Sequence, residues 1–149
     1  MEWVKRLHGA TVGLDTAPLI YFIERHSKYL PFVYPFFESV QQGDIRVVTS
    51  TLTLTEVLVH PYRRGDLELA NRYSRMLLTA RNFRTLSVTP EIATEAARLR
   101  AIHRIKTPDS IQLATALHGN ATAFLSNDGE LCQIPGIEFI LLDRLLAIS

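Results

Sequence analysis

The sequence predicts an α/β protein of one domain, in which helices cover both faces of a parallel β-sheet. The chain has 149 residues, enough for one domain with a core of its own. Short apolar or β-branched runs alternate along it with helical stretches, which is typical of parallel strands joined by helices. No repeat or low-complexity linker interrupts this alternation, so a single domain over residues 1–149 is expected.

Five strands are expected from short runs that end at turn or helix signals. The first run ends in an acid, the next two are rich in β-branched residues, and the fourth leads into a turn. They are ATVGLD (10–15), IRVVTS (45–50), FRTLSV (83–88), ATAFLSND (121–128) and IEFILLD (137–143).

Helices are expected between these strands, from apolar spacing and capping residues. Thr89 and Pro90 predict the start of a helix over 89–105, since proline suits the first helical position. Pro35 should break or kink the helix of its segment, and Pro61 should end another. The expected helices cover 16–25, 30–43, 53–61, 66–81, 89–105 and 107–118, with a short one after the last strand.

Charge is unevenly distributed along the chain. The net charge is +1, but residues 60–106 contain ten basic and four acidic side chains, whereas the remainder contains six basic and eleven acidic ones. A basic middle beside an acidic remainder favours a polyanion partner held near carboxylates. The alternative is that these arginines only form solvated helix faces.

Several classes of protein are excluded or disfavoured. A lone Cys132 excludes an internal disulfide framework and indicates a reducing compartment. The five histidines are scattered and give no zinc-binding spacing. No apolar run approaches the roughly 20 residues of a membrane helix, and the first residues lack the pattern of a signal peptide. A cytoplasmic protein without a membrane partner is therefore expected.

Four acids stand where expected strands give way to helices or turns: Asp15, Glu56, Asp109 and Asp128. In a parallel sheet such places share one edge, and ligands bind there. Carboxylates gathered at one edge repel each other unless a cation compensates them, and hard oxygen ligands select Mg²⁺ or Mn²⁺. Such a cluster can polarise a phosphodiester and activate water.

Each acid also has a structural interpretation. Thr53 and Glu56 fit a capping box, and Asp109 follows Pro108 at a helix start, where Thr107 would be the cap and the dipole favours an acid. Asp128 could belong to a turn. Asp15 is harder to explain in this way, because an acid directly after a buried strand needs a partner.

The short sequence motifs around the four acids resemble those of the PIN-domain family, in the same order and at similar spacing. The resemblance extends over about residues 11–143 and is strongest to the VapC-like ribonuclease toxins of bacterial toxin–antitoxin modules. The matching words are GLDTAPLIYFIE, TLTEVL, KTPDSIQLATAL and LSNDGEL. One departure is that the last word often reads Thr-Asn-Asp with an aromatic residue three positions on, whereas here Ser126 precedes Asn-Asp and Leu131 follows.

The resemblance implies a PIN-like α/β fold and metal-dependent cleavage of single-stranded RNA. Asp15 and Asp109 would be the most direct ligands of Mg²⁺ or Mn²⁺, Glu56 would complete the site and position water, and Asp128 would bind the metal directly or through water. Thr16 and Ser126 match hydroxyl positions that support the acids. Candidate contacts to the RNA backbone, from the charge pattern, are Arg63, Arg64 and Lys106.

The resemblance also implies partners. A cognate antitoxin would occupy the site or a neighbouring groove, and a homodimer is expected. The aromatic segment YFIERHSKYLPFVYPFF (21–37) is a candidate for that groove or for a dimer surface, and plain core packing is the alternative.

Two other functions are compatible with parts of the sequence. Phosphotransferases of the haloacid dehalogenase type also have a strand ending in Asp-Thr, but they need a second acid two residues after the first, where this chain has Ala17. The remaining alternative is a catalytically inactive or non-toxin PIN-like module that binds nucleic acid or a partner. The presence of all four acids favours a nuclease over that alternative.

Overall fold

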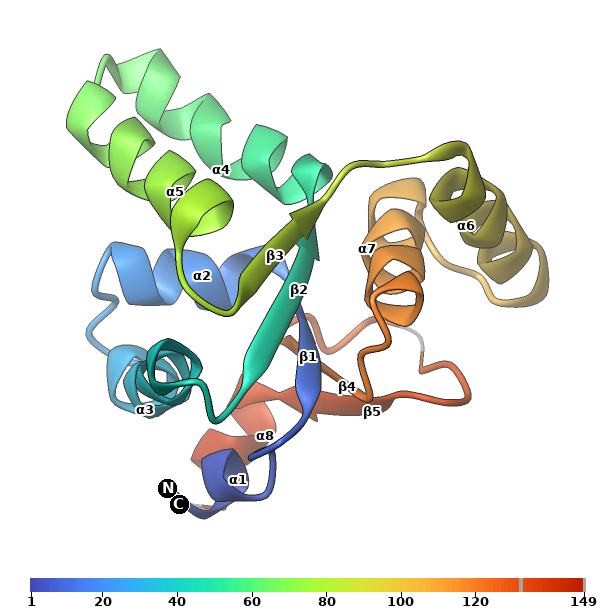
Figure 1. The fold of residues 1–149 in the computed structure, drawn as a ribbon, viewed down its shortest axis with the longest axis horizontal. Helices are drawn as coiled ribbons and strands as arrows, with labels where there is room; N and C mark the ends of the chain where they lie inside the picture. Colours follow the sequence, from blue (N-terminus) through green and yellow to red (C-terminus); the bar gives the residue numbers. More distant parts are fainter. Residues whose placement is uncertain (132, 149) are drawn as a thin grey trace.

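The computed structural model describes residues 1–131 and 133–148 and contains a five-stranded sheet with helices on both faces (Figure 1). The strand order is β3-β2-β1-β4-β5, and every pairing is parallel, which confirms the expected fold class. Cys132 lies outside the described residues, so the inference from it stays a prediction. The strands are β1 (Thr11–Leu14), β2 (Arg46–Ser50), β3 (Phe83–Leu86), β4 (Ala123–Ser126) and β5 (Glu138–Leu141).

The helices follow the expected order with shifted ends. A short N-terminal helix was not expected, because four residues are too few to show apolar periodicity; its Trp3 is buried and stacks on Phe36 at 6.0 Å between ring centroids. No helix among the described residues has the length and apolar character needed to cross a membrane. The helices are α1 (Glu2–Lys5), α2 (Thr16–Ile23), α3 (Leu30–Gln42), α4 (Thr51–Arg64), α5 (Leu67–Thr79), α6 (Pro90–Ile102), α7 (Thr107–His118) and α8 (Leu142–Ala147).

The two internal prolines do not end their helices. α3 continues through Pro35 to a left-handed Gly43, and α4 continues through Pro61 to a left-handed Gly65. The break considered at Pro35 and the stop expected at Pro61 are therefore wrong. Each proline removes one backbone donor at a cost of about 3 kcal/mol. Burial of large side chains on the same helices, such as Phe36, offsets a loss of that size.

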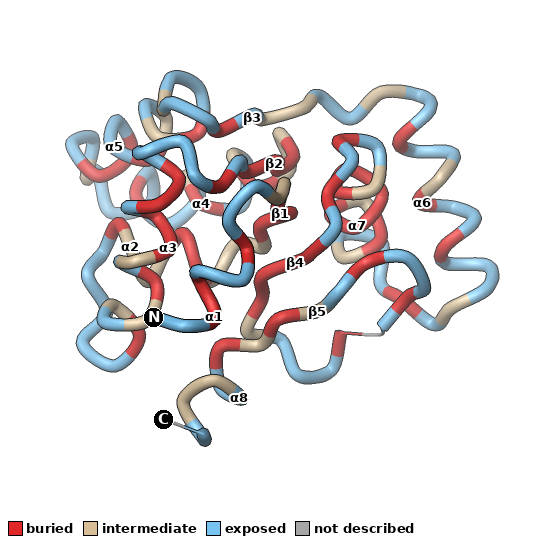
Figure 2. The backbone as a smooth tube through the Cα atoms, turned by 60° about the horizontal axis from the view of Figure 1, so that its bottom comes forward, coloured by how far each residue is buried: buried red, intermediate tan, exposed pale blue. Residues whose placement is uncertain are grey.

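The core consists of two apolar layers, one on each face of the sheet. Alternate residues of a strand point to opposite faces, so Val47 and Leu125 belong to one layer whereas Val48 and Phe124 belong to the other. The first layer packs under α1 to α5 and α8, and the second packs under α6 and α7. Figure 2 shows the strands as largely buried segments between helices whose outer turns are exposed.

Helix α7 lies unusually close to the sheet because two glycines leave room for it. A Cβ added at Gly13 in β1 would lie 2.5 Å from the Cβ of Ala116, and one added at Gly119 would lie 2.6 Å from Cγ2 of Val48. Both distances are far below a van der Waals contact. The close approach fixes the position of α7, and with it Asp109 in its first turn.

Replacement of Gly13 tests this packing. We expect Gly13→Ala to lower the free energy of unfolding by roughly 1–3 kcal/mol, the usual effect of overpacking a core. Urea unfolding measures the change. Gly129→Ala is the matched control, because an added Cβ there meets nothing within 4 Å. Equal stability of the two variants would contradict the close contact of α7 with β1.

Candidate active site

The four acids expected from the sequence lie at the carboxyl end of the sheet, each on a different segment. Asp15 directly follows β1 and caps α2, and Glu56 lies in the second turn of α4, the helix that follows β2. Asp109 lies in the first turn of α7, and Asp128 comes two residues after β4. Since β2, β1 and β4 are neighbours, their carboxyl ends bring these segments together (Figure 1).

Asp15 is held in place by hydrogen bonds on both carboxylate oxygens. Its Oδ1 accepts from the backbone N–H of Thr16 at 2.8 Å, and its Oδ2 accepts from the Ser126 hydroxyl at 2.7 Å. Ser126 Oγ also accepts from the backbone N–H of Asp128 at 3.0 Å. The structure therefore links the end of β1 to the segment that carries Asp128, with Ser126 between them.

The carboxylates influence each other electrostatically. Burial raises the pKa of Asp109 above its usual value, and the charges of Asp15 and Asp128 raise it further, while Lys106 opposes them. Partial burial also raises the pKa of Glu56, and the charges of Asp15 and Asp109 raise it further, whereas hydrogen bonding to the side chains of Gln112 and Thr16 lowers it. In the described part of the chain, none of the four acids forms an ion pair with a basic side chain.

The capping-box interpretation of Glu56 is wrong. α4 begins at Thr51, two residues earlier than expected, and Ser50 caps it by accepting the backbone N–H of Leu52 at 3.0 Å. Thr53 lies inside the helix, fully buried, so it cannot act as a cap. Glu56 is thereby left without a role in capping its helix.

The local interpretations of the other acids agree better with the structure. α7 is preceded by Lys106 as its N-cap, so Thr107 and not Pro108 is the first helical residue, one position from the expectation. Asp109 lies in the first turn, as expected. Asp128 takes part in a turn, because its Oδ1 accepts the backbone N–H of Glu130 at 3.0 Å. Neither role prevents these carboxylates from binding a cation.

The donor set suits a hard divalent cation by its chemistry. The four carboxylates, which form no ion pair among the described residues, offer the oxygen ligands that Mg²⁺ and Mn²⁺ prefer. Within residues 1–131 and 133–148, no three acidic, histidine or cysteine side chains converge closely enough to form a ready-made metal site. To bind one cation together, these carboxylates would have to move closer by side-chain rotation.

A polar cavity of about 220 Å³ adjoins the acids. The residues that line it are acidic, basic or apolar: Asp109, Asp128, Glu130, Arg104, Lys106, Ile105 and Leu131. Lys106, a candidate contact for RNA, therefore lies beside the acids. Arg63 and Arg64 do not: they occupy the last turn of α4, about 10 Å along the helix from Glu56 at 1.5 Å per residue.

Two residues of this region escaped the sequence analysis. Arg104 belongs to the basic segment, but nothing in its spacing singled it out. Gln112 follows Asp109 by three residues on α7, and this spacing places both on one helix face. That signal was present in the sequence, although the contact with Glu56 depends on how α4 and α7 pack.

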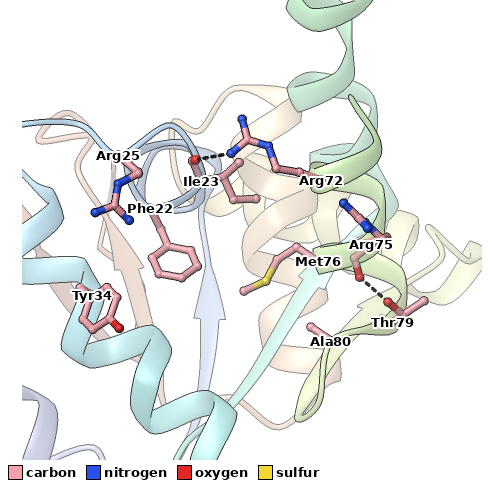
Figure 3. A pocket seen from close by; sticks show the side chains of 9 residues that line it. All are labelled: Phe22, Ile23, Arg25, Tyr34, Arg72, Arg75, Met76, Thr79 and Ala80. Atoms are coloured by element: carbon pink, nitrogen blue, oxygen red, sulfur yellow. Dashed lines mark hydrogen bonds between the residues drawn. The ribbon is translucent and has the colours of Figure 1, made fainter. Parts of the chain in front are cut away.

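A larger groove lies between α2, α3 and α5, away from the acids. Its volume is about 470 Å³, and Figure 3 shows Phe22, Met76 and Tyr34 around it. Arg25, Arg72 and Arg75 lie along the same groove. Phe22 and Tyr34 of the aromatic segment 21–37 line this groove, whereas other members such as Phe36 are core residues, as the packing alternative expects.

The chain matches the model of the PIN domain over residues 12–137. It belongs to the PIN-domain family. Cleavage of RNA by a nuclease is typical of this family. No curated protein matches the chain in sequence.

Solved structures share the fold. The structure of VapBC2 from Rickettsia felis bound to a promoter DNA fragment matches with a TM-score of 0.69 and 16% identity, over 88% of this chain and 98% of that chain. Mycobacterium tuberculosis VapC20, a toxin that cleaves the sarcin-ricin loop, gives 0.65 and 17%, over 81% and 92%. A toxin–antitoxin complex from Klebsiella pneumoniae gives 0.64 and 23%, over 89% and 98%. At these identities the likeness concerns the fold.

The raised pKa of Glu56 predicts a pH-dependent effect of its replacement. A carboxyl whose pKa is higher in the folded state contributes stability below its unfolded pKa and loses it as the pH rises through the folded pKa. In a chelating buffer, Glu56→Gln should therefore be more stable than wild type at neutral pH, with the advantage shrinking as the pH falls toward the carboxyl range. Chemical unfolding across this pH range measures it. An advantage that grows on acidification would contradict the repulsion.

Proposed function

We propose that this protein is an endoribonuclease that depends on Mg²⁺ or Mn²⁺ and acts as the toxin of a toxin–antitoxin pair. The observation that carries the proposal is the set of four carboxylates at one edge of a PIN-domain sheet, none of which forms an ion pair among the described residues. The proposal includes a cytoplasmic location, which suits an RNA substrate and a lone Cys132.

The four acids have distinct proposed roles in this mechanism. Asp15 and Asp109 would hold the cation, Asp128 would complete its ligands, and Glu56 would orient the attacking water. A divalent cation supplies, when bound, polarisation of the phosphodiester and activation of water. The hydrogen bonds of Ser126 and of the Thr16 backbone keep Asp15 oriented toward this centre.

Cations near the site would bind the RNA backbone. Lys106 and Arg104 line the cavity beside Asp109 and Asp128, so a phosphate bound there lies next to the cleavage centre. Arg63 and Arg64 remain candidates only for a more distant part of the strand. Arg64 is also engaged, since it lies 3.7 Å from Asp66 and 3.1 Å from the His60 ring.

The proposed partners are an antitoxin and a second copy of the chain. The groove of Figure 3 combines apolar side chains with three arginines, which suits an amphipathic acidic segment of an antitoxin. Exposed apolar side chains around the turn between α4 and α5 suit a homodimer interface: Val59, Tyr62 and Leu67. Solved relatives of the fold occur as toxin–antitoxin complexes, which supports the first partner.

Cleavage of end-labelled RNA tests the function. We expect cleavage with Mg²⁺ or Mn²⁺, none with EDTA, and a loss of roughly a thousandfold in Asp15→Asn and Asp109→Asn, because a cation provides several kcal/mol of transition-state stabilisation. Asp44→Asn is the matched control, since Asp44 precedes β2 at the opposite edge of the sheet. RNA binding without cleavage in either metal would contradict the proposal and favour an inactive binding module.

The salt dependence of RNA binding tests the proposed backbone contacts. Measured in the Asp109→Asn background by fluorescence anisotropy, Arg104→Ala and Lys106→Ala should each weaken binding. Each should also reduce the slope of log K against log salt by about 0.7, the value for one phosphate contact on a single strand. Arg63→Ala provides the comparison on α4. A larger loss of slope in that variant would place the RNA along α4 instead.

A further inference from the structure

Gln112 is a buried amide that connects α7 to the acid-bearing face of α4. Its side chain is 4% exposed and lies one turn after Asp109. Its Nε2 donates to the Thr53 hydroxyl at 2.6 Å and to Glu56 Oε1 at 3.4 Å. The second bond is long, close to the limit for a hydrogen bond.

The orientation of this amide follows from the hydrogen bonds behind it. The Thr49 hydroxyl donates its single proton to the backbone carbonyl of Leu14 at 3.0 Å. Thr49 can therefore only accept in its 2.9 Å bond with Thr53, so the proton of Thr53 is committed as well. Thr53 must then accept from Gln112, which places the amide nitrogen, and not the oxygen, on this side.

The consequence is a one-directional chain of donors. It runs from the amide of Gln112 through Thr53 and Thr49 to the carbonyl of Leu14, the residue before Asp15. Thr49 and Thr53 are 2% and 0% exposed, so water does not compete for these bonds. One amide proton is used by Thr53, and the other is directed at the Glu56 carboxylate.

Stability alone does not explain an amide at this position. Gln112 Oε1 is buried and has no hydrogen-bond partner among the described residues. An unsatisfied buried acceptor is unfavourable, and an apolar side chain of the same shape would avoid that cost. The amide lies beside the proposed active site, where proteins accept such costs for function.

We propose that Gln112 is a positioning residue, which holds the Glu56 carboxylate toward Asp15 and Asp109 so that it can orient water for phosphodiester hydrolysis. This role rests on the proposed nuclease function. Glu56 is on the exposed rim of α4, with a flexible side chain that the charges of Asp15 and Asp109 repel. The amide of Gln112 donates to that carboxylate and so opposes the repulsion.

Replacement of Gln112 by methionine tests this role. Gln112→Met keeps the shape and removes the donor, so we expect kcat for RNA cleavage to fall roughly tenfold and the Kd for Mn²⁺, measured by calorimetry, to rise several-fold. KM for RNA should stay within about twofold. The midpoint of urea unfolding should stay the same or rise, which a purely structural role of Gln112 would not allow.

Two further variants isolate the contact with Glu56. Thr115→Val is the matched control, because it removes another buried polar group from α7, whose one hydrogen bond among the described residues is to the Ile111 carbonyl of that helix. It should leave kcat and the Mn²⁺ affinity unchanged. In a Glu56→Gln background, Gln112→Met should change the Kd for Mn²⁺ by less than about twofold, since the carboxylate it orients is gone.

The outcomes separate this inference from the function on which it rests. An active wild type with an equally active Gln112→Met variant would overturn the positioning role alone. A less stable or unfolded Gln112→Met protein would also overturn it, by showing that Gln112 supports the fold. A wild type that cleaves no RNA with either metal would instead overturn the proposed function.

Discussion

Repulsion of Glu56 and Asp109 by neighbouring acids is the electrostatic constraint at the carboxyl edge of the sheet. Asp15, Glu56, Asp109 and Asp128 come from four segments, and no basic side chain in the described part of the chain forms an ion pair with them. The folded state tolerates this repulsion because the parallel sheet brings the four segments to one edge. Apolar layers packed on both faces of the sheet stabilise that arrangement. A bound divalent cation would turn the same repulsion into attraction, so the unfavourable arrangement is consistent with a functional site.

The support of the site is as specific as the acids themselves. α7 can approach β1 and β2 closely only because Gly13 and Gly119 lack side chains, and this approach places Asp109 next to the end of β1. Buried hydroxyls behind the acids, on β2 and α4, then connect α7 to the last carbonyl of β1. The acids proposed as metal ligands, and the Gln112 amide behind Glu56, thus depend on the same helix-to-sheet contact.

Much of this arrangement could be predicted from the sequence, because it depends on local patterns. Alternating apolar runs gave the parallel sheet, and acids at the ends of those runs gave the site edge. Features that depend on tertiary packing could not be predicted. Helix α4 continues through Pro61, which is itself buried with Val57 on one face of the helix. Thr53 resembles a helix cap in the sequence, but it is buried and accepts a hydrogen bond from Gln112. The position of Arg104 beside Asp128 likewise depends on the tertiary fold and could not be predicted from its spacing.

If the four carboxylates bind a divalent cation, that cation must stabilise the folded protein. The free energy of unfolding, measured with and without the cation, shows whether it does. The comparison is between wild type and Asp109→Asn, each in EDTA and in excess Mn²⁺. We expect Asp109→Asn to be the more stable protein in EDTA. Mn²⁺ at a hundred times Kd should raise the free energy of unfolding of wild type by about 2.7 kcal/mol over its value in EDTA, and wild type should then be the more stable protein. If Mn²⁺ stabilises neither protein, or both equally, the claim is contradicted.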